Sequence, residues 1–443
     1  MSDRGHLLRV LGLVFGLAAV VGGVVGQGIL RAPGVVAQAD SSVAVLLGLW
    51  LFGGLLSLVL ALPYAELGAA IPSAGGGIDY AGRAFGPIIR VAAAWLLLVG
   101  MIAAFAMVTY VLGEFLVRLG VGGGTLSPEV LATACLAIFF VLNSLGTRIA
   151  GSIQIGFAAL KGALLIGLVV ALFAQPSAVG APPPMPEKAG TMLAYATAIM
   201  LIIGACNGWH AVVNYSEEIE NPGRAIPRAL FGGIAMVTAL YLLVNAAMFH
   251  VLPPAALAAS DFAAADAARG VFGDRAGFAF TLFGVISVGA IANMMLMTNA
   301  RIAFATARAG VLPRRFISVD ARGVPLAAMT LVALTAAAFI LSGTYLALAS
   351  TSTAMAQGMY IVVTLAAIAL RRKEPDLPRP FRIPAFPFVI GIVLAINLAL
   401  MAVFVVQDPW NALIGFAIVA ALTLASAILP HGSWTDDLEP ENP

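Results

Sequence analysis

The sequence is poor in charged residues. Only 10% of its 443 residues are Asp, Glu, Lys or Arg, against about 25% in an average soluble protein, whereas 61% are hydrophobic. One soluble core does not grow large enough to bury so much apolar surface. This composition excludes a soluble enzyme and a disordered scaffold, and a net charge of only +2 gives no reason to expect nucleic acid as a partner. The expected solvent for most of the chain is the lipid bilayer.

Cysteine and histidine are also scarce. The two cysteines, Cys135 and Cys206, lie in apolar runs, and the four histidines are scattered. These residues are too few for a disulfide framework or a structural zinc site, and the sequence has no phosphate-binding glycine loop, HExxH or GxSxG motif. Clustered His, Asp or Glu are missing from the apolar runs, which argues against a membrane-embedded enzyme. We expect no metal, no cofactor and no covalent chemistry.

Long apolar runs, by contrast, are abundant. A membrane helix needs about 20 mostly apolar residues, and twelve runs come close to or exceed this length. They lie at residues 10–38, 43–69, 88–119, 127–145, 150–174, 191–219, 228–252, 278–308, 324–342, 345–370, 384–406 and 410–430. The first run outlasts a signal-peptide core and has no cleavage site, so we interpret it as a span. The sequence thus predicts an all-α membrane protein with twelve transmembrane helices.

The basic residues give this protein an orientation. With twelve spans and the N-terminus inside, most of the 23 Lys and Arg residues fall in inner segments, including Arg314, Arg315 and the run from Arg371 to Arg382. Cytoplasmic loops carry such an excess. We therefore expect both termini to be cytoplasmic, in a multi-pass protein of the bacterial inner (plasma) membrane.

The first and sixth spans share an unusual interruption. Glycine and a polar residue occur near the middle of each, in Gly26-Gln-Gly and in Gly204-Ala-Cys-Asn-Gly. Paired interruptions in corresponding positions of two halves indicate a transporter binding site. We therefore predict a five-plus-five inverted repeat in which helices 1 and 6 are broken. Its parts are residues 10–174 for helices 1–5, residues 191–370 for helices 6–10, and residues 384–430 for helices 11–12 outside the repeat.

Such interruptions suit a zwitterion. Glycine costs about 1 kcal/mol in a helix interior relative to alanine, and unwound backbone at membrane depth is tolerated where it lines a cavity. Freed N–H groups at the start of a half-helix suit a carboxylate, and freed carbonyl groups suit an ammonium. The alternative is close helix packing through small residues. We favour packing for Gly22-Gly23 alone and a binding site for the two interruptions taken together.

Two further polar residues lie within spans. Lys161 lies about a dozen residues along the fifth span from Arg148, at about 1.5 Å per residue, which is too deep for easy snorkelling. We expect it to face a cavity or a partner. His210 shares one face of the sixth span with Asn207 and Asn214, and we interpret it as a packing residue rather than a proton carrier.

These motifs resemble those of the amino acid–polyamine–organocation superfamily, close to its L-amino acid transporter branch. Gly26-Gln-Gly-Ile-Leu is similar to the family's GSGIF segment, and residues 207–229 form the most specific match. Residues 66–76, 301–313 and 375–384 fit as well. The resemblance covers most of the chain, from the first span to the loop after the tenth.

The resemblance implies a substrate site near mid-membrane. Its residues would be Val24, Gly26, Gln27, Gly28, Gly204 and Asn207. The glycine segment of span one would bind the substrate carboxylate through the N–H groups of Gln27 and Gly28. The carbonyl groups of Val24, Gly204 and Asn207 would bind the ammonium. Lys161 matches the lysine of sodium-independent members, which stands where sodium-coupled relatives keep a cation.

Two departures from the family pattern bear on the substrate. Gln27 replaces a small Ser or Thr, and Gly204 stands where many members have an aromatic gate, which should enlarge the pocket. We predict secondary active transport of amino acids by alternating access, independent of sodium, as an exchanger or coupled to protons. The alternatives are a polyamine or organic-cation carrier, disfavoured because spans one and six lack an acidic residue for a second ammonium, and a non-transporting nutrient sensor. The sequence leaves the side-chain preference, the direction of transport and the oligomeric state open.

Overall fold

The protein is built from helices. The computed structural model describes residues 12–73, 75–144, 162–177, 184–185, 187, 189–216, 219–260, 262–308, 310–319, 324–342 and 345–428. Its helices are α1 (Leu13–Val24), α2 (Gln27–Ala37), α3 (Val43–Leu60), α4 (Leu62–Ala70), α5 (Gly77–Phe85), α6 (Pro87–Arg118), α7 (Pro128–Ser144), α9 (Met192–Ala205), η1 (Trp209–Tyr215), α10 (Pro222–Val251), α11 (Pro254–Ala258), α12 (Ala263–Phe272), α13 (Asp274–Arg308), η2 (Arg314–Ile317), α14 (Leu326–Ser342), α15 (Tyr345–Lys373), α16 (Phe386–Gln407) and α17 (Pro409–Ile428). No strand occurs within these described ranges, so the all-helical prediction is confirmed for them.

Many of these helices are long and apolar enough to cross a bilayer. Within the described residues, eight meet that test, and the bent pair α1 and α2 makes a possible ninth, with 48° between its halves. Shorter apolar helices of 10–17 residues lie at Pro128–Ser144, Gly162–Phe173 and Leu326–Ser342. The chain is therefore an integral, multi-pass membrane protein.

Local sequence signals fix where several helices begin. Pro87 opens α6 directly after Gly86, whose φ of +91° suits glycine. Pro222 opens α10 in the same way, and the hydroxyl of Ser42 caps α3 by accepting a hydrogen bond from the Val45 N–H at 3.4 Å. Proline at a first helical position costs no hydrogen bond, because that N–H has no partner inside the helix.

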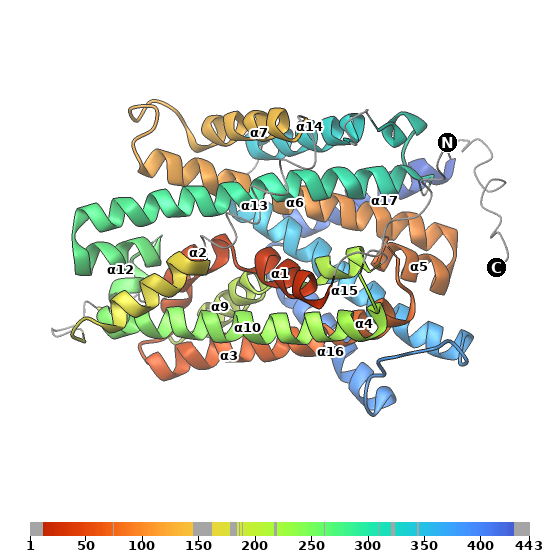
Figure 1. Ribbon diagram of the computed structural model, residues 1–443, viewed down its shortest axis with the longest axis horizontal. Coiled ribbons are helices and arrows are strands. Elements are labelled where there is room, and N and C mark those ends of the chain that lie inside the picture. Colours follow the sequence, from red (N-terminus) through yellow and green to blue (C-terminus); the bar gives the residue numbers. More distant parts are fainter. Residues whose placement is uncertain are drawn as a thin grey trace.

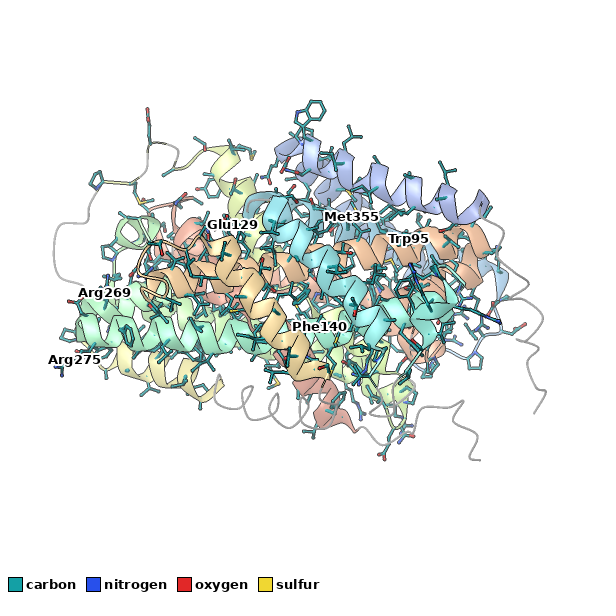
Figure 2. All side chains as sticks on the ribbon, turned by 90° about the horizontal axis from the view of Figure 1, so that it is seen from above. Trp95, Glu129, Phe140, Arg269, Arg275 and Met355 are labelled. Atoms are coloured by element: carbon teal, nitrogen blue, oxygen red, sulfur yellow. The ribbon has the colours of Figure 1, made fainter. Side chains whose placement is uncertain are left out.

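The long helices run side by side along the molecule (Figure 1). Helices α6, α10 and α13 extend along its length, α4 and α5 lie at one end, and α12 lies at the other. Seen from above, Arg269 and Arg275 lie at the α12 end, whereas Phe140 lies on a long face (Figure 2). Large apolar side chains stay exposed on these long faces, among them Leu334 at 67% and Phe388 at 71%. Charge at the ends and apolar surface between them is the pattern expected in a bilayer.

The two interrupted helices lie in the middle of this bundle. Helix α1 packs against α10 and η1, and α2 packs against α9. The N-terminal half of each span therefore contacts the C-terminal half of the other, which places both interruptions at the centre of the fold.

Candidate functional site

The first interruption separates α1 from α2. Helix α1 ends at Val24, and α2 begins at Gln27, with Gly26 in an extended conformation (φ −145°, ψ −147°) as its N-cap. A Cβ on Gly26 would lie 2.9 Å from the Ile291 side chain of α13. Glycine thus lets α13 approach the open backbone closely.

The second interruption separates α9 from η1. Helix α9 ends at Ala205, and the chain reaches η1 through Cys206, Asn207 and Gly208. Gly208 has a φ of +111°, in the left-handed region that favours glycine. The shorter, 3-10 geometry of η1 means that the second half of this span is not a regular α-helix.

The structure brings the two interruptions into direct contact. A Cβ on Gly208 would lie 2.7 Å from the carbonyl oxygen of Gly23, so the main chains of the two spans touch at this point. A Cβ on Gly28 would lie 2.6 Å from the Cβ of Ala205. Glycine is therefore required by packing at Gly208 and at Gly28, whatever these residues bind.

One tyrosine joins the two broken helices. The hydroxyl of Tyr241, on α10, lies 3.0 Å from the carbonyl oxygen of Val24 and 3.1 Å from that of Ala205. These carbonyls belong to the last residues of α1 and α9, where helical partners run out. Tyr241 is 1% exposed and its ring stands edge-on to Trp50. A hydroxyl has a single proton. Tyr241 therefore donates to one carbonyl at a time, or it shares one bifurcated hydrogen bond between the two.

A second tyrosine fixes the polar side chains after the break. Asn207 Oδ1 accepts hydrogen bonds from the Gly208 N–H at 2.6 Å and from the Tyr360 hydroxyl of α15 at 2.7 Å. Since the Tyr360 proton is used in this way, its contact of 3.3 Å with His210 Nδ1 requires Nδ1 to carry the proton. In neutral His210 the lone pair then lies on Nε2, which has no hydrogen-bond partner among the described residues.

Aromatic rings surround Asn207 and His210 on the side that faces α4 and α15. Tyr64 of α4 meets Trp209 edge-on, with ring centroids 5.4 Å apart, and Tyr360 stacks on Trp209 at 5.3 Å. The ring of His210 contacts Tyr64, Trp209 and Tyr360. These contacts agree with the packing role predicted for His210 and leave one of its nitrogens available as an acceptor.

The predicted site residues fall into two groups. Val24, Gly26, Gly28, Gly204 and Asn207 all lie at the two interruptions that the structure brings together. The backbone of Gln27 starts α2 there, whereas its side chain and the whole of Lys161 lie outside the described residues. Substrate binding by these residues stays a prediction.

Two details change how these residues are understood. The carbonyl of Val24 already accepts from Tyr241, and that of Gly204 accepts from the Asn207 N–H at 3.2 Å. Each carbonyl has a second lone pair for a ligand. At Gly204 an added Cβ would meet no atom within 4 Å, so a side chain could begin there without displacing a neighbour.

For four residues that meet at the interruptions, sequence reasoning predicted no contact and no role in the site. Tyr241, Tyr360 and Ala205 carried no local signal, because they lie in apolar runs and contribute through contacts that only the fold creates. Gly208 did carry one, since it follows Asn207 directly and Asn-Gly pairs often mark turns.

Comparison with known proteins agrees with this architecture. The family model described as "Amino acid permease" matches residues 7–427 of the chain. The chain belongs to the amino acid permease family. It is 28% identical to the b(0,+)-type amino acid transporter 1 of Mus musculus over 418 residues, which cover 91% of this chain and 84% of the relative. The serine/threonine exchanger SteT of Bacillus subtilis (strain 168) is 25% identical over 401 residues, with 89% and 90% covered.

A third relative is named for different substrates. The human cystine/glutamate transporter is 28% identical over 428 residues, which cover 94% of this chain and 84% of that protein. The resemblance to the amino acid–polyamine–organocation superfamily is thereby confirmed. Family membership and these relatives support transport of amino acids, and they describe transporters rather than enzymes.

Proposed function

We propose that the protein is a secondary carrier that moves amino acids by alternating access and holds them through main-chain groups at its two helix breaks. The convergence of two helix ends carries this proposal. The carbonyl oxygens of Val24 and Ala205 both lie within 3.1 Å of the Tyr241 hydroxyl oxygen. Carbonyl groups at helix C-termini carry partial negative charge and attract cations. An ammonium group bound beside Tyr241 would meet both.

The start of α2 offers the complementary half of the site. The first N–H groups of a helix have no partners inside it, and Gly26, as N-cap, has no side chain that could accept from them. A helix N-terminus attracts anions. A carboxylate at Gln27 and Gly28 and an ammonium at the converging carbonyls together define a zwitterionic α-amino acid.

We further propose twelve spans in a five-plus-five inverted repeat, with the predicted boundaries of residues 10–174, 191–370 and 384–430. The long helices, the bent pair and the shorter apolar helices coincide with the predicted runs, and the interruptions fall in the first and sixth. The basic last turn of α15 (Arg371, Arg372 and Lys373) contacts α4 through Glu66 and α5 through the carbonyl of Ala84. Because α4 and α5 lie at one end of the molecule (Figure 1), this charge supports placing that end in the cytoplasm. Both termini would then face the cytoplasm of a cell with this protein in its inner membrane.

Transport by this carrier should not require sodium. Lys161 is expected to supply, in the fifth span, the positive charge that a bound cation would otherwise provide. We expect exchange of amino acids across proteoliposomes to be equal in sodium and in choline buffer. Lys161→Ala should abolish it, whereas Lys188→Ala, in a polar loop, should leave it unchanged. Sodium-dependent uptake by the unmodified protein would exclude this assignment of Lys161.

The proposed function is tested by measuring the flux of amino acids across a membrane. Purified protein in proteoliposomes loaded with an unlabelled amino acid should take up labelled amino acids from a panel, with and without a proton gradient. Uptake that follows an inward proton gradient would indicate proton coupling, and uptake that needs only internal substrate would indicate exchange. Binding of an amino acid without flux would identify a sensor instead, and uptake of polyamines alone would identify an organic-cation carrier.

A further inference from the structure

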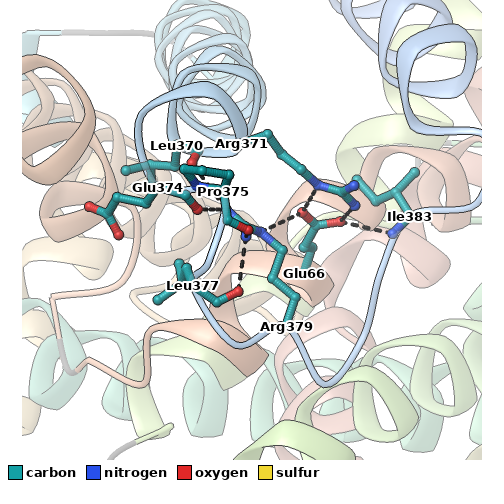
Figure 3. A network of polar contacts seen from close by, with 8 residues as sticks. All are labelled: Glu66, Leu370, Arg371, Glu374, Pro375, Leu377, Arg379 and Ile383. Atoms are coloured by element: carbon teal, nitrogen blue, oxygen red, sulfur yellow. Dashed lines mark hydrogen bonds and ion pairs between the residues drawn. The ribbon is translucent and has the colours of Figure 1, made fainter.

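A buried carboxylate ties α4 to the far end of α15. Glu66 is 0% exposed, and its two oxygens accept from Nε and Nη2 of Arg371, each at 2.7 Å (Figure 3). The N–H of Ile383 adds a third hydrogen bond at 2.8 Å, and Arg379 Nε lies 3.4 Å away. A bidentate pair with a further backbone donor is a strong, geometrically specific arrangement.

Arg379 extends this arrangement to the end of α15. Its Nη2 donates to the carbonyl oxygens of Leu370 and Glu374, each at 3.0 Å, and its Nη1 donates to Leu377 at 3.0 Å. The Leu370 carbonyl also accepts from the Glu374 N–H at 2.9 Å, and the Glu374 carbonyl lies just beyond the helix. Carbonyl groups at a helix C-terminus carry partial negative charge, which a guanidinium complements. The loop after α15 is thereby folded back against the helix and against Glu66 (Figure 3).

Helix α5 is attached to the same place. Arg83 donates to both oxygens of Glu374, at 2.8 and 2.7 Å, and Lys373 donates to the carbonyl of Ala84 at 2.7 Å. The Arg83 guanidinium holds the pKa of the Glu374 carboxyl below its ordinary value. We refer to the buried group of Glu66, Arg371 and Arg379 as the α4–α15 clamp. The more exposed Arg83–Glu374 pair lies beside it and attaches α5 to the end of α15.

The clamp holds the two helices that flank the second break. Tyr64 precedes Glu66 by two residues on α4, and Tyr360 lies on the same helix as Arg371. The rings of Tyr64 and Tyr360 meet edge-on at 5.7 Å, and both contact Trp209, the first residue of η1. The aromatic wall beside the half-helix therefore depends on how α4 and α15 are held together.

The contacts between η1 and this wall are of a weaker kind. They are ring contacts, the hydrogen bond of 3.3 Å between His210 Nδ1 and the Tyr360 hydroxyl, and the neutral hydrogen bonds between Ser216 and Ser73, in the loop after α4. The Ser216 Oγ accepts from the Ser73 N–H at 2.8 Å and donates to the Ser73 carbonyl at 3.2 Å. Opening the clamp would leave a charge buried without its partner, which is strongly unfavourable. Among the described residues, separating η1 from the wall breaks neutral contacts only.

We propose that Glu66 is a positioning residue for transport. The clamp stays closed through the whole cycle, so that α4 and α15, with α5 attached to them, form one stationary wall, and η1 moves against that wall. This proposal rests on the alternating-access function proposed above, and it assigns the moving boundary to the Ser73–Ser216 contact rather than to the ion pairs.

Cross-linking distinguishes the stationary boundary from the moving one. The double variant R83C/E374C, joined by a short bismaleimide, fixes α5 to α15. The double variant S73C/S216C, joined by a disulfide, fixes η1 to the wall. We expect the first cross-link to leave exchange within twofold of the uncross-linked protein, and the second to lower it at least tenfold, with recovery on reduction.

Single-cysteine variants with the same reagents control for modification, including that of the two native cysteines. A block by the R83C/E374C cross-link would overturn the proposal, and so would full exchange by the S73C/S216C disulfide. If the uncross-linked protein exchanges no amino acid, the proposed function fails instead, so the two failures are separate.

A substitution at Glu66 tests its positioning role directly. Glu66→Gln keeps the shape of the side chain but removes its charge, and Glu374→Gln is the matched control at the exposed pair. We expect Glu66→Gln, purified as a monodisperse protein, to lower the maximal exchange rate at least tenfold while the half-saturating substrate concentration changes less than threefold. Glu374→Gln should change both less than twofold. An unchanged maximal rate in folded Glu66→Gln would overturn the proposal, and the cross-linking test does not depend on how this variant folds.

Discussion

Removing a single oxygen atom tests whether the two helix breaks act together. Tyr241→Phe deletes the hydroxyl that reaches the carbonyls of Val24 and Ala205 at 3.0 and 3.1 Å, and it keeps the ring that packs against Trp50. A buried acceptor left without its donor costs about 1–3 kcal/mol. If that cost falls on the state that binds and carries substrate, exchange should fall roughly 5- to 150-fold, since each 1.4 kcal/mol is tenfold.

The assay for Tyr241→Phe is counterflow of a labelled amino acid in proteoliposomes, together with the apparent melting temperature with and without substrate. Tyr110→Phe is the matched control, because its hydroxyl bonds to Glu129 at 3.1 Å and takes no part in the contact between the breaks. We expect the control to exchange normally. A folded Tyr241→Phe protein with full exchange and full stabilisation by substrate would refute the coupling of the two breaks through this hydroxyl.

Three further predictions follow from the surroundings of Gly208, Gly204 and Glu374. Gly208→Ala should abolish exchange and lower the melting temperature, because its Cβ would lie 2.7 Å from the Gly23 carbonyl at a φ of +111°; normal exchange would show that the spans can separate there. Gly204→Phe should fold normally and shift uptake toward small amino acids, since open space surrounds this residue; an unchanged substrate profile would place it outside the pocket. The lowered pKa of Glu374 means that its pair with Arg83 stabilises the fold above the ordinary pKa of 4.5 and loses this effect as the pH falls through the lowered value. Melting temperatures of Glu374→Gln should therefore decline less on acidification than those of the unmodified protein, by the equivalent of at most about 1 kcal/mol, and an equal decline would assign the acid sensitivity to other groups.

The sequence predicted those parts of the fold that have local causes. Apolar runs predicted the long helices, and the glycines around Gln27 and after Gly204 predicted the two interruptions, because the cost of helical glycine is a property of the residue itself. The short helices α5 and α12, at the ends of the molecule, were not predicted. They are too short to span a bilayer, and their polar residues resemble those of loops.

The partners of the interruptions could not be predicted in the same way. Tyr241 lies 36 residues from Ala205, and Tyr360 lies 153 residues from Asn207. Each looks like an ordinary aromatic residue of an apolar run until helix packing places its hydroxyl at a break. For Gly28 the sequence predicted a role but not the whole of it. The prediction assigned Gly28 to the substrate carboxylate, and the structure shows that it also packs against Ala205. A bulky residue there would test both roles at once.

The joint between Gly23 and Gly208 also bears on how such a carrier could change during evolution. At Gly208 a side chain is excluded by a main-chain oxygen 2.7 Å away, whereas at Gly204, four residues earlier, a side chain can begin without displacing any atom within 4 Å. Mutation is therefore constrained at the point where the half-helices meet and permitted where the space beside them opens. If Gly204 lines the substrate pocket as predicted, a lineage with this joint can acquire a new substrate preference by one substitution there, while the joint keeps its original fit.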